Sequence, residues 1–175
     1  MSTTTHRAPP PWSLGGPSHA TADYGLEIER TGPLAVATLR AVVAMPRDFA
    51  TVRQSFRADR YRGRRVRFRA TARTVDVVGR AWLWMRVDGE RGDPPLAFDG
   101  MGGRGLDGNC DWGEHAVVLD VAPAARTVHF GFALQGTGAL RVRGMGFEVV
   151  DDTVAVTDTP LADVPQNLAL ADLSG

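Results

Sequence analysis

Residues 82–88 read WLWMRVD, and the alternation within them decides how this chain folds. Successive side chains of a β-strand point to opposite faces, so one face of this stretch carries Leu83, Met85 and Val87. The other face carries Trp82, Trp84, Arg86 and Asp88. The first set is typical of a buried core. The second joins two large aromatic rings to a cation and a carboxylate, which suits neither a dry core nor an ordinary solvated surface.

The same alternation recurs along the chain, most clearly in residues 64–74 and 127–135. Short apolar runs are separated by Gly, Pro and Asp, and no long segment has a helical period. The candidate strands are residues 24–30, 34–44, 48–57, 64–74, 80–88, 95–99, 115–121, 127–135 and 139–150. Because each strand must bury its apolar face, we expect an all-β fold of two packed antiparallel sheets. A jelly-roll sandwich is favoured over an immunoglobulin-like one.

The 175 residues, of which 43% are hydrophobic, are enough for one domain with a sizeable core. Residues 1–22 are rich in Thr, Pro, Gly and Ser and predict an irregular N-terminal arm, which Trp12 is able to dock. The jelly roll is expected over residues 23–157. Residues 158–175 are expected to form an extended C-terminal tail.

Composition narrows the classes of partner. Twenty basic residues balance twenty acidic ones, so we expect neither nucleic acid nor a membrane as partner. The N-terminus lacks the pattern of a secretory signal, and no apolar run is long enough to span a bilayer. The single cysteine, Cys110, has no Cys/His cluster around it at zinc-binding spacing. We therefore expect a cytoplasmic protein without metal or cofactor, and a homodimer remains open.

Several stretches together resemble a known family. They are FRADRYRGRRVRFRA (56–70), AWLWMRVDG (81–89), LAFDGM (96–101), DWGEHAVVLDVAPAA (111–125), FGFALQGTG (130–138) and GFEVV (146–150). In this order they resemble a bacterial galactose-binding-like jelly-roll domain. That domain is similar to carbohydrate-binding modules and occurs alone or fused to helix-turn-helix regulators of the AraC type. The resemblance implies a jelly roll that binds a ligand, without naming the ligand.

One motif that is usual in this family is missing from the chain. Its members usually have an Asp–Asp pair before the last strand, where carbohydrate-binding relatives often hold calcium, but this chain has Arg143 and Gly144 there. The resemblance therefore does not predict a calcium site. The architecture is similar to that of certain natural-product cyclases, and this likeness at the level of fold raises the prospect of catalysis without locating it.

The aromatic and charged face of residues 82–88 predicts a groove on one sheet. Aromatic rings offer flat apolar platforms, and arginine and carboxylate groups orient a ligand through charge-assisted hydrogen bonds. The predicted ligand-binding residues are Trp82, Trp84, Arg86, Gln135, Gln54 and His129. Asp99 is expected to close the same groove.

Two main functions follow from this groove. The first is binding of a small organic ligand, sugar-like or an aromatic or apolar metabolite. The alternative is a cofactor-independent cyclase or isomerase of a secondary metabolite, with Asp88 or Asp99 as the catalytic acid and Arg86 or Gln135 stabilising negative charge on oxygen. A purely structural or protein-interaction role is the third reading. The sequence leaves open whether the protein is an enzyme.

Overall fold

The computed structural model describes residues 2–158 and is built almost entirely of antiparallel strands. The strands are β1 (Ser2–Thr5), β2 (Ser13–Gly15), β3 (Tyr24–Thr31), β4 (Leu34–Ala41), β5 (Phe49–Arg57), β6 (Arg64–Asp88), β7 (Ala97–Asp99), β8 (Leu106–Gly108), β9 (Gly113–Val121) and β10 (Thr127–Val150). One short helix, α1 (Ala20–Asp23), and two 3₁₀ turns, Ala58–Arg60 and Gly102–Arg104, complete the elements. None of the described helices is long and apolar enough to cross a membrane.

Two long strands, β6 and β10, form the frame of the fold and pair with each other over nearly their whole length. The sequence predicted a break in each, but both run continuously through a bend. At the bend Gly79 pairs with Gly136, and both have positive φ, 131° and 86°. A Cβ on Gly136 would lie 2.0 Å from the carbonyl oxygen of Val78, so only glycine fits there. The glycines thus turn each strand from one layer into the other without interrupting its pairing.

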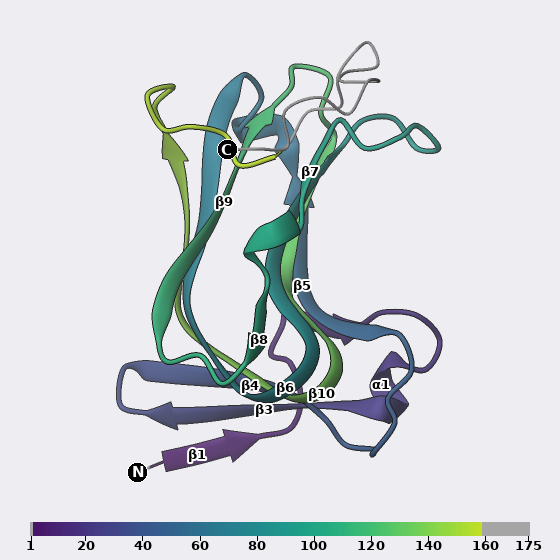
Figure 1. The fold of residues 1–175 in the computed structure, drawn as a ribbon. Helices are drawn as coiled ribbons and strands as arrows, with labels where there is room; N and C mark the ends of the chain where they lie inside the picture. Colours follow the sequence, from purple (N-terminus) through teal and green to yellow (C-terminus); the bar gives the residue numbers. More distant parts are fainter. Residues whose placement is uncertain (1, 159–175) are drawn as a thin grey trace, which may run out of the picture.

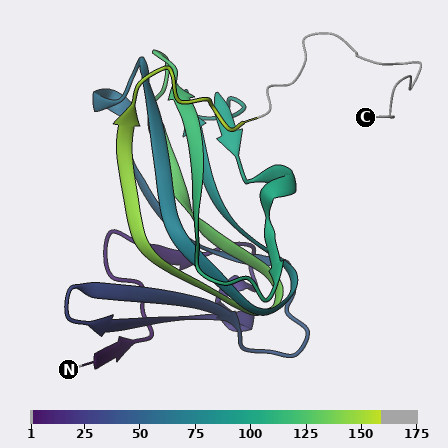
Figure 2. The same ribbon diagram turned by 60° about the vertical axis from the view of Figure 1, so that its left-hand side comes forward.

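The bend creates two layers that face each other (Figures 1 and 2). In the first layer the strand order is β2, β5, the first half of β10, the second half of β6, and β7. In the second layer the order is β1, β3, β4, the second half of β10, the first half of β6, and β9. The all-β jelly-roll sandwich expected from the sequence is confirmed.

The core lies between the layers and is supplied by the apolar face of each strand. Leu83, Met85 and Val87 are at most 1% exposed, as the alternation of residues 82–88 predicted. Phe68 of the second layer meets Phe130 of the first with ring centroids 4.9 Å apart. Aromatic contacts of this kind connect the two halves of the frame into one core.

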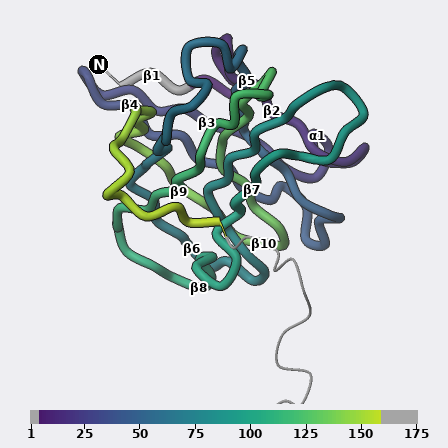
Figure 3. The backbone as a smooth tube through the Cα atoms, turned by 90° about the horizontal axis from the view of Figure 1, so that it is seen from above, coloured from purple at the N-terminus to yellow at the C-terminus, as the bar shows by residue number. Residues whose placement is uncertain are grey.

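The N-terminal segment differs from the irregular arm expected from its composition. Its β1 pairs with β3 and its β2 pairs with β5, because short Ser- and Thr-containing stretches can add to the free edges of the two layers. Figure 3 shows β2 at the periphery, next to β5. Trp12 packs edge-on against Phe130 at 5.4 Å and ties the segment to the core. The predicted C-terminal tail lies, from residue 159 onward, outside the described residues.

Candidate ligand-binding groove

The outer face of the first layer carries a groove of about 380 Å³. Strands β5, β6, β7 and β10 and the turn after β2 contribute to it. Its lining residues are Gly16, Pro17, Phe49, Thr51, Arg53, Trp82, Trp84, Arg86, Phe98 and Ala133. The volume falls within the range of small-molecule sites, about 300–1,000 Å³.

Small residues on the central strand β10 make room for the groove. Gly131 pairs with Arg53 on one side and with Trp84 on the other, and Ala133 lies in the next row. These positions carry little or no side chain on the outer face, whereas the strands on either side carry long ones. A depression therefore runs along β10 between two raised borders.

Trp84 is held across this depression by a hydrogen bond to the far border. Its Nε1–H donates to Oγ1 of Thr51 at 2.8 Å, and the Thr51 hydroxyl donates to the carbonyl oxygen of Phe132 at 3.1 Å. Since β10 lies between β5 and β6, the indole must bridge roughly 10 Å, which is two strand spacings. Between the two borders β10 has only Gly131 and Ala133 on this face, and a Cβ at Gly131 would lie 2.1 Å from the carbonyl oxygen of Val52 on β5, so only glycine fits there. The ring is thus oriented by its polar end while its apolar surface borders the groove.

Aromatic side chains dominate the end of the groove near the β6–β10 bend. Phe49 and Trp82 face each other across β10 with centroids 5.9 Å apart. The guanidinium of Arg80 lies 4.9 Å from the centre of the Trp82 ring, a cation–π contact. Phe98, on β7, is 54% exposed although it is a large apolar residue. Apolar area of this kind beside a depression indicates a binding surface.

The opposite end of the groove is charged. Arg86 donates from Nε and Nη2 to Oδ2 of Asp88, at 3.1 and 2.8 Å. His129 Nε2 lies 3.1 Å from the same oxygen, and its Nδ1 lies 2.7 Å from Oγ of Ser55. Because a carboxylate only accepts, Nε2 carries the proton and Nδ1 of the neutral ring accepts the Ser55 hydroxyl. Arg53 completes this end and, within residues 2–158, has no carboxylate within ion-pair distance.

Burial lowers the pKa of His129, and the nearby positive charges of Arg86 and Arg53 lower it further. The carboxylate of Asp88 acts in the opposite direction, through its charge and its hydrogen bond, without reversing the shift. The imidazole is therefore neutral near pH 7. It links Ser55 to Asp88 as a fixed hydrogen-bonding group rather than as a second counter-ion for the carboxylate.

The structure brings together most of the residues predicted for the groove. Trp82, Trp84 and Arg86 line it directly. His129 and Gln135 lie on the same outer face, His129 in the row of Arg86 and Gln135 in the row of Arg80. Asp88 is also on this face and lines an adjoining hollow that shares Arg86 with the groove.

The placement expected for Gln54 is wrong. It pairs with Phe130 and lies on the same side of β5 as Val52, which faces the core. Strand alternation puts Thr51 and Arg53 on the outer face instead. The groove residues of β5 are therefore the neighbours of the predicted one.

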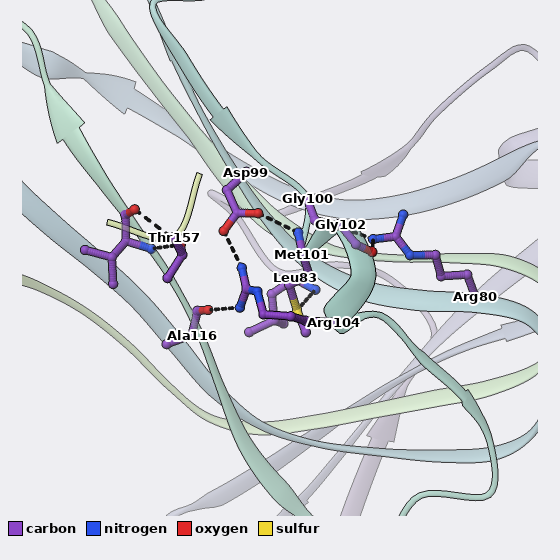
Figure 4. A network of polar contacts seen from close by, with 10 residues as sticks. Arg80, Leu83, Asp99, Gly100, Met101, Gly102, Arg104, Ala116 and Thr157 are labelled. Atoms are coloured by element: carbon purple, nitrogen blue, oxygen red, sulfur yellow. Dashed lines mark hydrogen bonds and ion pairs between the residues drawn. The ribbon is translucent and has the colours of Figure 1, made fainter. Parts of the chain in front are cut away.

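Asp99 is also displaced from its expected position. It pairs with Met85, a core residue, and is only 6% exposed. Its Oδ1 accepts the backbone N–H of Met101 at 2.7 Å, and its Oδ2 accepts Nη2 of Arg104 at 2.5 Å (Figure 4). The side chain organises the turn after β7 from within the fold. Its neighbour Phe98 is the residue of this strand that borders the groove.

Sequence reasoning missed four lining residues whose signals were present. Phe49, Thr51 and Arg53 alternate within the predicted strand 48–57, and the same reasoning that selected Trp82 and Trp84 would have selected them. Phe98 stands beside the residue chosen in LAFDG. No group of three or more His, Cys, Asp or Glu side chains in the described part of the chain could hold a metal ion.

The architecture is similar to that of known proteins. No family model matches the chain. The C-terminal family 22 carbohydrate-binding module of Clostridium thermocellum Xyn10B superimposes with a TM-score of 0.53, covering 85% of this chain and 91% of that chain at 11% identity. The CBM22-1 xylan-binding domain of Paenibacillus barcinonensis Xyn10C gives a TM-score of 0.52, covering 86% and 93% at 8% identity. The chain has the jelly-roll fold of carbohydrate-binding modules. At these identities the likeness concerns the fold alone.

A sequence relative has a different description. The chain is 34% identical over 167 residues to YbfP of Bacillus subtilis (strain 168), an uncharacterized HTH-type transcriptional regulator. The match covers 92% of this chain, and the chain spans 56% of the length of that relative. The jelly roll described here is thus similar to one part of a larger protein.

Proposed function

We propose that this jelly roll binds a small organic ligand, sugar-like or aromatic, in the groove on the outer face of its first layer. The observation that carries the proposal is the arrangement of Phe49, Trp82 and Trp84 around the depression above β10. Flat apolar rings at the border of a groove stack against a sugar or aromatic ring. Trp84 is already oriented by Thr51, so little side-chain freedom is lost on binding.

Two lines of similarity support this reading. Two solved jelly rolls of the same fold are carbohydrate-binding modules, one of them described as a xylan-binding domain. The relative named as a transcriptional regulator provides a setting in which a ligand-binding domain acts as a sensor. Both settings require binding without chemical change of the ligand. The cyclase alternative loses support because Asp99 lies on the core side of β7 and Asp88 is engaged by Arg86 and His129.

The test uses tryptophan fluorescence with phenyl β-glucoside as the probe, since this compound joins a sugar ring to an aromatic ring. Wild type is compared with Trp84→Ala and with the matched control Trp112→Ala. Trp112 lies outside the groove, where Arg143 stacks on it at 4.1 Å. We expect saturable binding that Trp84→Ala weakens about tenfold or more and Trp112→Ala preserves, because removing a stacking ring costs about 1–3 kcal/mol. Equal affinity of wild type and Trp84→Ala would count against the groove as the binding site.

A further inference from the structure

The groove is not neutral in charge. Its lining includes two arginines, Arg53 and Arg86, and no Asp or Glu. Both residues belong to the same end of the groove: Arg53 pairs with Gly131, and Arg86 lies in the next row of the outer face, beside His129. Phe49 and Trp82 occupy the other end. The groove is therefore polarised, with an apolar part and a cationic part.

The positive charge at this end is only partly balanced. Among residues 2–158, Asp88 is the one carboxylate that contacts Arg86, and both hydrogen bonds from Arg86 go to one of its oxygens. The same oxygen also accepts from His129. Arg53, on the opposite border, forms no ion pair with any residue that the structure describes. This end of the groove thus has two arginines and one carboxylate, which pairs with Arg86 and has His129 as a further partner.

An unpaired arginine beside a groove is suited to an anionic ligand. The guanidinium has five N–H donors in a planar fork that matches a carboxylate. Its position on β5 puts it on the outer face of the layer together with Thr51 and Ser55, where it lines the groove. Arg86 has its Nη1 group without a hydrogen-bond partner in the described structure, so it is able to donate from the other border. A carboxylate above Gly131 would have donors on both sides.

Resting on the proposed binding function, we infer that the ligand of this groove is a ring compound that carries a carboxylate. Its ring packs between Phe49, Trp82 and Trp84, and its carboxylate lies between Arg53 and Arg86. A uronic acid and an aromatic carboxylic acid both have this chemistry. Neutral sugars lack the group that the cationic end is built to receive.

Two matched pairs of probes distinguish these sources and test the charge. Phenyl β-glucuronide and phenyl β-glucoside differ only at the carboxylate, and so do phenylacetate and phenylacetamide. Isothermal titration of the whole chain is expected to give about tenfold tighter binding of the acid in at least one pair, because a charge-assisted hydrogen bond contributes about 1.5–3 kcal/mol. The pair that shows the larger preference identifies the source as a sugar acid or an aromatic acid.

The arginine variants decide whether the preference belongs to this site. Arg53→Gln is expected to reduce the acid-over-neutral preference by about tenfold, and Arg53→Lys to restore only part of it because an ammonium lacks the fork. The control Arg60→Gln removes one positive charge at an exposed position of the turn Ala58–Arg60 and is expected to keep the preference. Circular dichroism confirms that each variant is folded.

The outcomes separate this inference from the proposed function. If both members of a pair bind equally and Trp84→Ala weakens both, the groove binds ligands but the carboxylate preference is wrong. A preference that survives in Arg53→Gln likewise overturns the inference. If none of the four compounds binds at millimolar concentration, both the inference and the proposed function are contradicted.

Discussion

The two halves of β6 carry arginines in different surroundings. In the half that belongs to the second layer, Arg65 is 2.7 Å from Asp120, while Arg67 and Arg69 both contact Glu148, at 2.9 and 3.1 Å. These pairs cross to the neighbouring strands β9 and β10. In the half that belongs to the first layer, Arg86 pairs with Asp88, whose carboxylate also contacts His129, and Arg53 in the adjacent row of β5 has no ion pair among residues 2–158.

This difference shows that the same alternation of side chains occurs in two different electrostatic surroundings. Arginines that meet acidic cross-strand neighbours keep a surface soluble and block unwanted edge pairing. Arg53 and Arg86 instead line a groove beside aromatic rings, and these are the arginines that we propose to act on a ligand. The two halves have the same alternation in the sequence, and only the residues on neighbouring strands distinguish them.

The largest expected effect on stability comes from the core, to which both halves of β6 contribute their apolar face. Phe68→Ala removes a ring buried in the second layer and Leu83→Ala a side chain buried in the first, so we expect losses of about 3–5 and 2–5 kcal/mol of unfolding free energy. Because the halves contribute to one core, each variant should still unfold in a single transition in urea. Separate transitions for the two layers would break the view that they are one folding unit.

An intermediate effect on stability is expected from the second-layer half of β6, whose arginines pair with acidic residues. Hydrogen bonds from Arg67 and Arg69 lower the pKa of Glu148. A carboxyl group whose folded pKa is lowered stabilises the fold above its unfolded pKa, and this contribution is lost as the pH falls toward the folded pKa. Glu148→Gln should therefore lower the melting temperature modestly at pH 7, and the difference from wild type should shrink below about pH 4.5.

The comparison variant for that experiment is Asp88→Asn, in the other half. It removes the one acidic partner that Arg86 has in the described part of the chain, so the positive charge of this end of the groove is less balanced. We expect its main effect on ligand binding rather than on melting. A larger loss of stability than that of Glu148→Gln would show that both halves use acidic residues in the same way.

The smallest expected effect is on the pH dependence of stability, and it comes from His129. Burial lowers its pKa in the folded state, so the unfolded chain binds a proton more readily than the folded chain. Stability is therefore complete above the unfolded pKa of about 6.5 and decreases as the pH falls from there toward the lower folded pKa. His129→Gln should flatten this decrease between about pH 7 and pH 5, measured by urea unfolding. Ser55→Ala keeps the imidazole and should retain the decrease, and a steeper slope in His129→Gln would contradict the assignment.

Particular residues show where prediction from the sequence succeeded. The alternation around Leu83 and Met85 was sufficient to place them in the core and to place Trp82 and Trp84 outside it. It failed where the choice concerned neighbouring residues on another strand: Gln54 and Asp99 were chosen for their chemistry, although alternation puts Arg53 and Phe98 on the groove side. Gly131 gave no signal in the sequence, although the close approach of the β5 backbone allows only glycine there.

The sequence by itself determined the type of fold and the two faces of each strand, because the period of a strand is local and each apolar face must be buried. It could not determine that Arg53 and Arg86 lie on either side of Gly131. That arrangement depends on the register of β5, β10 and β6, which pairs residues far apart in the sequence, such as Gly131 with Arg53 and with Trp84. The tertiary structure pairs these strands. This pairing decides which charged side chains are neutralised and which remain beside the aromatic groove.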